Sequence, residues 1–144
     1  MKDTINELFN AARQTGTAIA EKAKAAGQAA VDSTLQKIEN WLEEFPRIES
    51  YGLRVTGSAF VMGIMPALEV EFKGAHTDFP DEKISAILEE NASGSLTWMV
   101  YHAVKNAYRL HRKITPALDD PLIVKVRLSL SPEISVFVGQ PNIR

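Results

Sequence analysis

Residues 122–138 read LIVKVRLSLSPEISVFV, and apolar side chains occupy every second position on both sides of the Ser131-Pro132-Glu133 break. A period of two is typical of strands that bury one face. Ser and Pro favour turns, so the stretch predicts a β-hairpin with strands at about 122–130 and 134–138.

A second hairpin is predicted earlier in the chain. Apolar residues mark one strand over 51–62, interrupted by Gly57, and alternate with glutamates over 68–72, with a turn at 63–66 between the strands. Oppositely charged residues of the two hairpins are expected to pair across the polar face of the sheet: Glu69 and Glu71 with Lys125 and Arg127.

Two helices are expected between the hairpins. Pro80 fits a helix start and Asp81 favours the positive end of the helix dipole. Asn91–Gly94 ends this short helix, and Ser95 caps a longer one that runs to about Lys113. The apolar stripe predicted for the longer helix is Leu96, Met99 or Val100, Ala103, Ala107 and Leu110.

The first 45 residues differ in composition from the rest. Nine of the twenty residues from Ala11 to Ala30 are alanine, and no proline occurs before Pro46. We expect a helix from Asp3 or Thr4 to about Glu44, roughly 60 Å long at about 1.5 Å per residue. An element of this length must overhang or bend, because it exceeds the diameter of a body of this size.

Spacing within this helix predicts two modes of packing. Small or apolar residues recur in steps of four and three, as in a heptad seam: Ile5, Phe9, Ala12, Gly16, Ile19, Ala23, Ala26 and Ala30. After Ala30 the phase slips, and larger residues suited to docking on a sheet continue as Thr34, Ile38, Trp41 or Leu42, and Phe45. The small seam buries too little area to hold the helix on its own body, so we expect it to meet another copy.

The order of elements predicts an α+β fold: a long N-terminal helix, a β-hairpin, two helices and a β-hairpin. Its four-stranded, mainly antiparallel sheet is expected to be covered by helices on one face. Residues 1–45 are predicted to be an amphipathic interaction element, and residues 46–144 a small globular domain. A homo-oligomer is expected, most simply a dimer.

Composition excludes several classes of protein. Sixteen basic and 18 acidic residues give a net charge of −2, which disfavours a nucleic-acid partner. Zero cysteines exclude disulfides, thiolate nucleophiles and cysteine-bound metals. The longest stretches without charge, such as Val55–Leu68, are shorter than the roughly 20 residues of a transmembrane helix. Asp3 and Glu7 are incompatible with a secretory signal, so a cytoplasmic location is expected.

A ligand site is predicted on the helix of residues 95–113. Its aromatic and basic residues form a second stripe that suits a planar or anionic ligand in a pocket between the sheet and the helix: Trp98, Tyr101, His102, Lys105, Tyr108 and Arg112. The favoured alternative places Trp98 and Tyr101 in the core or at its edge, with the basic side chains lying over the tyrosines. Arg109, His111, Arg112 and Lys113 either offset the helix dipole or bind a phosphate or an acidic lipid head.

No recognised pattern predicts catalysis, a metal or a cofactor. His102 and His111 are nine residues apart on one helix and point to opposite sides, so they do not converge on one ion. His76 with Asp78 and Asp81 fits either a carboxylate–imidazole site or, as the favoured interpretation, a solvated loop. Glycine-rich phosphate loops and nucleophile elbows are absent from the sequence. The expected function is therefore non-catalytic binding or scaffolding through self-association of the N-terminal helix. The alternatives are a small-molecule or anion-binding protein, an enzyme without a recognised motif, and a protein associated with a lipid surface, to which the charge of −2 on residues 1–45 is poorly suited.

Overall fold

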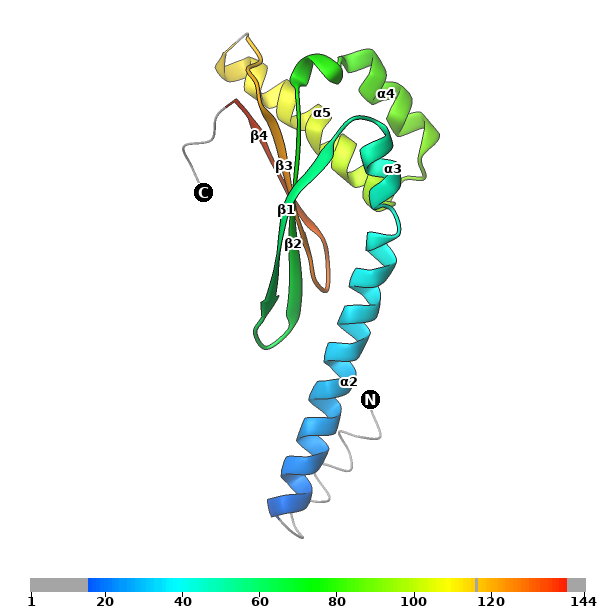
Figure 1. Cartoon of the computed structure of the whole chain (residues 1–144), viewed down its shortest axis with the longest axis vertical. Coiled ribbons are helices and arrows are strands. Elements are labelled where there is room, and N and C mark those ends of the chain that lie inside the picture. The colour runs from blue at the N-terminus through cyan, green and yellow to red at the C-terminus, as the bar shows by residue number, and fades with distance from the viewer. Residues whose placement is uncertain (1–15, 116, 140–144) are drawn as a thin grey trace.

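The computed structural model describes residues 16–115 and 117–139, with side chains from residue 27 onward. Its four strands form one antiparallel sheet in the order β1-β2-β3-β4, with helices against one face, which confirms the predicted α+β class (Figure 1). The elements are α2 (Gly16–Leu42), α3 (Phe45–Ser50), β1 (Arg54–Met62), β2 (Pro66–Gly74), a 3₁₀ turn (His76–Asp78), α4 (Asp81–Glu90), α5 (Leu96–Ile114), β3 (Leu122–Leu128) and β4 (Glu133–Val138).

The strand register separates an apolar face of the sheet from a charged one. Val70 pairs with Val126 and Phe72 with Val124, and all four side chains are buried against the helices. On the opposite face, Glu69 pairs with Arg127 and Glu71 with Lys125, as the alternation predicts. The Arg127 guanidinium lies 3.2 Å from the Glu69 carboxylate, so one of the two expected ion pairs is present.

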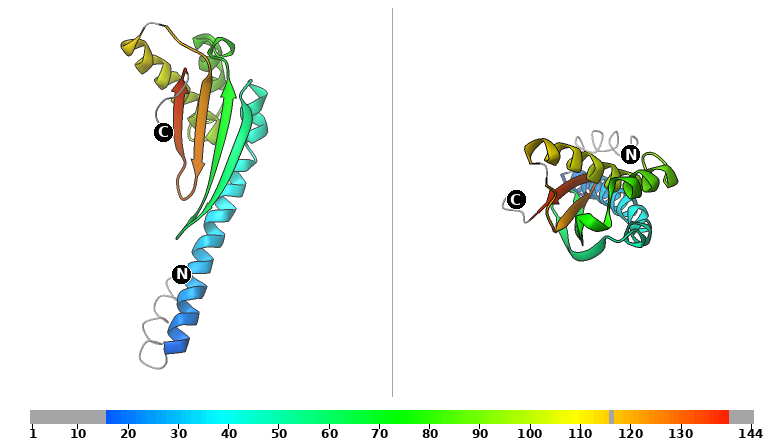
Figure 2. Two further views of the ribbon diagram at one scale, coloured as in Figure 1. Left: turned by 60° about the vertical axis from the view of Figure 1, so that its left-hand side comes forward. Right: turned by 90° about the horizontal axis from the view of Figure 1, so that it is seen from above.

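Helix α2 docks on the body only through its C-terminal part. Thr34 and Ile38 are buried and the helix contacts β2, which confirms that the stripe of larger residues faces the sheet. The N-terminal part of α2 extends past the β1–β2 turn (Figures 1 and 2), as its length implies. The predicted start of the helix at Asp3 or Thr4 lies outside the described residues.

A short helix follows α2 that the periodicity does not predict. The main helix ends at Leu42, and α3 begins at Phe45 with Pro46 in its first turn. Proline fits the first turn of a helix but not its interior, so it ends one helix and starts the next. Helix α3 buries Ile48 completely and packs the Phe45 ring edge-on against Phe72, with ring centroids 5.1 Å apart.

Helix α5 is capped as predicted, and it buries the first part of the predicted stripe but not the last. The Ser95 hydroxyl accepts a hydrogen bond from the Trp98 backbone N–H at 3.2 Å. Leu96 and Val100 of the predicted stripe are buried, but from there on Tyr101, Val104 and Tyr108 take the buried positions, and Leu110 is 54% exposed. Two tyrosine rings bury far more apolar area than the alanines of the predicted stripe, so the helix is rotated toward them.

The carboxylate of Glu44 connects the segment between α2 and α3 to the start of α5. Its oxygens accept hydrogen bonds from the backbone N–H groups of Leu96 and Thr97 at 3.1 and 3.0 Å and from the Thr97 hydroxyl at 3.0 Å. The backbone of Glu44 also starts α3, since its carbonyl accepts from the Ile48 N–H at 3.1 Å. One residue thus begins α3 and satisfies the unpaired donors and positive dipole end of α5.

Removing this carboxylate is expected to destabilise the whole domain. Glu44→Ala leaves two backbone donors and a buried hydroxyl without their acceptor, so the free energy of unfolding should fall by about 1–2 kcal/mol. Glu44→Gln retains an acceptor oxygen but loses the charge, and should cost less. Urea denaturation measures both, with the exposed neighbour Glu43→Ala as the control. Equal stabilities of Glu44→Ala and Glu43→Ala would contradict this role.

Candidate functional site

The two tyrosines of the predicted ligand stripe are buried in the core. Tyr101 is fully buried and donates a hydrogen bond of 2.7 Å to the carbonyl of Ile48, while Tyr108 lies 3.5 Å from the carbonyl of His76. Burial raises the pKa of both hydroxyls well above the ordinary tyrosine value. The structure therefore places these two rings under α5 and away from solvent. For Tyr101 this is the core position that the sequence favours over a ligand site.

Other residues of the stripe lie together on the solvent side of α5. The Trp98 and His102 rings are stacked with centroids 4.3 Å apart, and the Arg112 guanidinium lies 5.6 Å from the centre of the Tyr108 ring. His102, Lys105 and Arg112 all line a hollow of about 490 Å³ between α4 and α5, which we call the α4–α5 hollow. Its remaining lining residues are Asp81, Ser85, Asn106 and Arg109.

The predicted interface seam is only partly described. Ile5, Phe9 and Ala12 lie outside the described residues, and at Gly16, Ile19, Ala23 and Ala26 the structure describes only the helical backbone. Ala30 is half-buried, at the point where α2 reaches the body. The seam therefore stays a prediction from the sequence.

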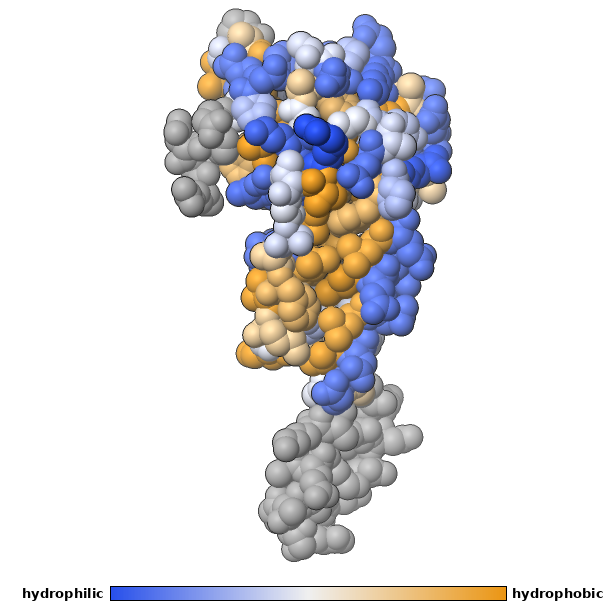
Figure 3. All heavy atoms as spheres, in the orientation of Figure 1, coloured by the Kyte–Doolittle hydropathy of each residue, from blue (hydrophilic) through white to orange (hydrophobic). Residues whose placement is uncertain are grey.

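An exposed apolar surface lies on the β1–β2 hairpin, at a place where the sequence predicts no site. All nine residues of the edge strand β1 are exposed. We define the hairpin patch by its large apolar members: Val55, Phe60, Val61, Met62 and Ile64. Phe60 is 57% exposed, Met62 60% and Ile64 97%. Figure 3 shows apolar surface gathered beside α2, over the end of the sheet at the β1–β2 turn.

The register explains why part of the patch faces the helical side of the sheet. Phe60 pairs with Leu68, and directly paired residues of antiparallel strands share a face. Among the described residues, the contacts of β1 are mainly with its neighbour β2 and only slightly with any helix, so Phe60 remains open to solvent. The charge-free run from Val55 to Leu68 was the one feature of the sequence that could have indicated this exposed patch. It did not do so, because a run without charge does not reveal whether its strand lies at the edge of a sheet.

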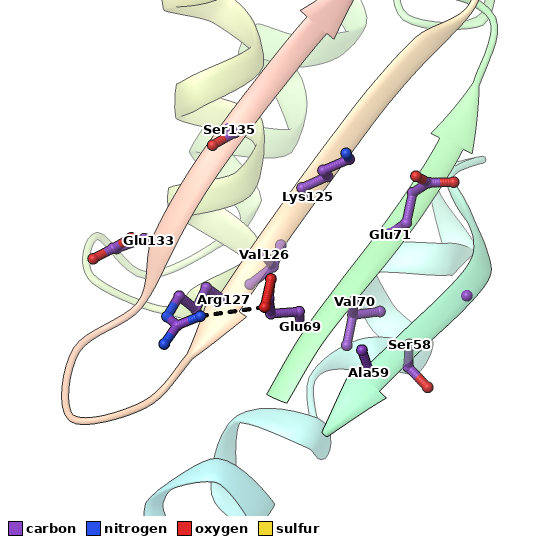
Figure 4. A pocket seen from close by; sticks show the side chains of 11 residues that line it. Ser58, Ala59, Glu69, Val70, Glu71, Lys125, Val126, Arg127, Glu133 and Ser135 are labelled. Carbon is purple, nitrogen blue, oxygen red and sulfur yellow. Dashed lines mark hydrogen bonds and ion pairs between the residues drawn. The ribbon is translucent and has the colours of Figure 1, made fainter. Parts of the chain in front are cut away.

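The opposite face of the sheet carries a charged hollow of about 450 Å³ (Figure 4). Its charges are largely engaged with neighbours: Glu69 with Arg127, Glu71 with the Thr56 hydroxyl at 2.7 Å, and Lys125 with the ring of Phe137 at 5.2 Å. Acidic and basic groups alternate across the strands, so no single sign of charge dominates. This face is suited to solvent contact rather than to selective recognition of one ion.

His76 pairs with a residue from a distant loop rather than with Asp78 or Asp81. Its ring nitrogen Nδ1 and its backbone N–H both contact Asp120 Oδ1, at 2.7 and 2.8 Å. The backbone hydrogen bond lowers the pKa of the Asp120 carboxyl below its ordinary value, and the His76 ring acts in the same direction. The contact fastens the loop before β3 to the turn after β2.

The described residues contain neither a grouped set of metal ligands nor a helix that could span a membrane. Within residues 16–115 and 117–139, no three metal-ligating side chains group closely enough to hold an ion. None of the helices described there combines the length and hydropathy that crossing a bilayer requires. Comparisons of the chain with family models, curated proteins and solved structures found no match, so the candidate surfaces rest on their own geometry.

The two buried tyrosines provide a matched test of hydrogen-bond strength. Tyr101→Phe leaves the Ile48 carbonyl with only the 3.4 Å hydrogen bond from the Tyr51 backbone N–H, and it is expected to lower the free energy of unfolding by about 1–2 kcal/mol. Tyr108→Phe removes a longer contact and should cost less than half as much. Chemical denaturation of both variants measures the difference, and an equal loss would mean that the Tyr101 bond has no special weight.

The His76–Asp120 contact predicts a specific response to acid. A carboxyl whose pKa is lowered by folding contributes stability above its unfolded pKa, near 3.8, and loses it as the pH falls through the folded value. The Tm of the wild type should therefore fall more steeply between about pH 5 and pH 3 than that of Asp120→Asn. Thermal unfolding followed by circular dichroism tests this, and Asp119→Asn should keep the wild-type slope.

Proposed function

We propose that this protein is a non-catalytic binding or scaffolding protein that self-associates through α2 and the hairpin patch. The observation that carries the proposal is the exposure of Phe60 and Met62 on the edge strand β1 and of Ile64 in the β1–β2 turn. Among the described residues, no helix makes more than slight contact with β1. Edge strands in monomeric proteins ordinarily carry charges or prolines that block pairing. β1 has a bulge between Val55 and Gly57, but from Val55 onward it has no charged residue.

A second copy of the chain is the occupant that best fits this surface. Because the run from Val55 to Leu68 carries no charge, two copies meet there without electrostatic repulsion. The part of α2 that extends past the β1–β2 turn has no sheet of its own to lie on, and its sequence has the four-three spacing of helix association (Figures 1 and 2). The small-residue seam and the patch of large residues are therefore complementary in size.

The energetic scale supports an assembly that uses both surfaces. Full burial of one large apolar side chain contributes about 1.5–3 kcal/mol. In a twofold dimer both copies bury the same patch residues, so each position contributes two side chains. Association itself costs about 4–15 kcal/mol in lost freedom. Four of the five patch residues are only 39–60% exposed in the single chain, so each gains less than full burial on association. Patch and helix together therefore reach this range more readily than either alone. A dimer and a cytoplasmic location belong to the same proposal.

A lipid surface is a weaker candidate for the same patch. Residues 1–45 carry five basic and seven acidic side chains, which gives little attraction to anionic headgroups. The run from Val55 to Leu68 contains no lysine or arginine, whereas helices and hairpins that lie in a membrane interface typically carry them beside their apolar residues.

The double variant Phe60→Ser/Met62→Ser is expected to dissociate the assembly. These side chains are exposed, so folding should be preserved while the dimer is weakened by about 3 kcal/mol, on the order of 100-fold in Kd. Sedimentation velocity measures the change, and Ile114→Ser, at an 84% exposed position on α5, is the matched control.

Two further measurements separate the contributions. Ile19→Glu tests the predicted seam of α2 and leaves the sequence of the hairpin unchanged. A wild type that is monomeric at high concentration would overturn the proposal, and flotation of that monomer with neutral vesicles would assign the patch to lipid instead.

A further inference from the structure

Positive charge is concentrated on one helix of this acidic protein. Helix α5 carries Lys105, Arg109, Arg112 and Lys113 and no acidic residue over 19 positions, whereas the whole chain has a net charge of −2. Favourable interaction with the helix dipole explains basic residues only in the last turn of a helix. Lys105 lies more than two turns before the end at Ile114, so the dipole does not account for it.

The α4–α5 hollow collects these cations in a concave site. Lys105, Arg109 and Arg112 project into it from successive turns of α5, together with His102 and Asn106, and Asp81 and Ser85 come from α4. Every lining residue is polar or charged, so the hollow does not suit an apolar ligand. Its volume of about 490 Å³ lies within the range of small-molecule sites.

The single acidic residue of the hollow is already neutralised. Arg112 contacts both carboxylate oxygens of Asp81, with its closest approach at 3.0 Å, and its guanidinium also lies over the Tyr108 ring. Arg112 is thus held in place by structural contacts. Among the described residues, Lys105 and Arg109 form no ion pair, and the Arg109 guanidinium makes only a 3.4 Å contact to the Asn106 side-chain oxygen.

Polar groups around the two unpaired cations are positioned by short-range contacts. The Asn106 amide donates to the backbone carbonyl of His102 at 3.0 Å, and the His102 ring is stacked on Trp98. Within the part of the chain that the structure describes, these contacts hold the rim of the hollow and leave the Lys105 ammonium and most donors of Arg109 available. An ammonium and a planar guanidinium one turn apart form a pair suited to the oxygens of a phosphate group.

We propose that the α4–α5 hollow binds a phosphate monoester, with Lys105 and Arg109 holding the phosphate. Ser85 and Asn106 then face the organic part of the ligand, for which the hollow has room, and Arg112 remains on Asp81. The site lies at the end of the molecule away from the β1–β2 turn (Figure 1), so it does not depend on the proposed self-association. The phosphate belongs to a free metabolite or to a lipid headgroup, since both present the same chemistry.

The test titrates the full-length protein with glycerol phosphate at low salt and follows backbone amide resonances by NMR. Saturable shifts are expected for residues lining the hollow on α4 and α5. Lys105→Gln/Arg109→Gln should weaken binding at least about tenfold, because charge-assisted contacts to phosphate are removed. Lys113→Gln removes one positive charge from the same helix outside the hollow, half of what the double variant removes, and should leave the affinity within about twofold.

Several outcomes distinguish the proposal from its competitors. Equal weakening of binding by Lys113→Gln would overturn the proposal in favour of diffuse attraction by the charge of the helix. The proposal would also be overturned if the shifts did not saturate at millimolar glycerol phosphate and the protein did not bind phosphatidic acid vesicles. Co-sedimentation with phosphatidic acid vesicles that Lys105→Gln/Arg109→Gln abolishes would support the site with a lipid source. Phe60→Ser/Met62→Ser should bind glycerol phosphate normally, and amide spectra of each variant verify the fold.

Discussion

The hydrogen bonds to the Glu44 carboxylate hold together two parts of the chain that are about fifty residues apart. The segment between α2 and α3 supplies the acceptor, and the start of α5 supplies the donors. The direction of α5, the cover it forms over the sheet and the docking of α2 all depend on this junction. The bond from Tyr101 to the Ile48 carbonyl reinforces the junction from inside the core, because Ile48 belongs to the helix that Glu44 begins.

This arrangement leaves the two hairpins in unequal surroundings. Helix α5 packs along β4 and β3, and α2 reaches β2, so the sheet is covered from its β4 side inward. The edge strand β1 is left beyond the last helix, with Phe60 and Met62 pointing to the side of the sheet that the other strands bury. Covering this edge completes the apolar layer, which is the physical basis for expecting a second copy there.

The two proposed surfaces differ in the forces they use. The hairpin patch is uncharged and acts through removal of apolar area from water, which salt affects little. The α4–α5 hollow is lined by polar groups alone and acts through charge, which added salt screens. The two surfaces lie at opposite ends of the body, so the proposed self-association and the proposed anion binding do not compete for the same elements (Figure 1).

Local chemistry made much of the architecture predictable. Alternation of apolar residues determined the four strands, Pro80 and Ser95 marked two helix starts, and the phase slip after Ala30 marked where α2 meets the sheet. These features depend on neighbours a few residues apart, which a sequence displays directly. Tertiary packing alone decided the Glu44 cap, the rotation of α5 toward Tyr101 and Tyr108, and the exposure of β1. Each of these depends on which distant segments compete for the same apolar area and the same hydrogen-bond donors, and that competition is resolved only when the whole chain is folded.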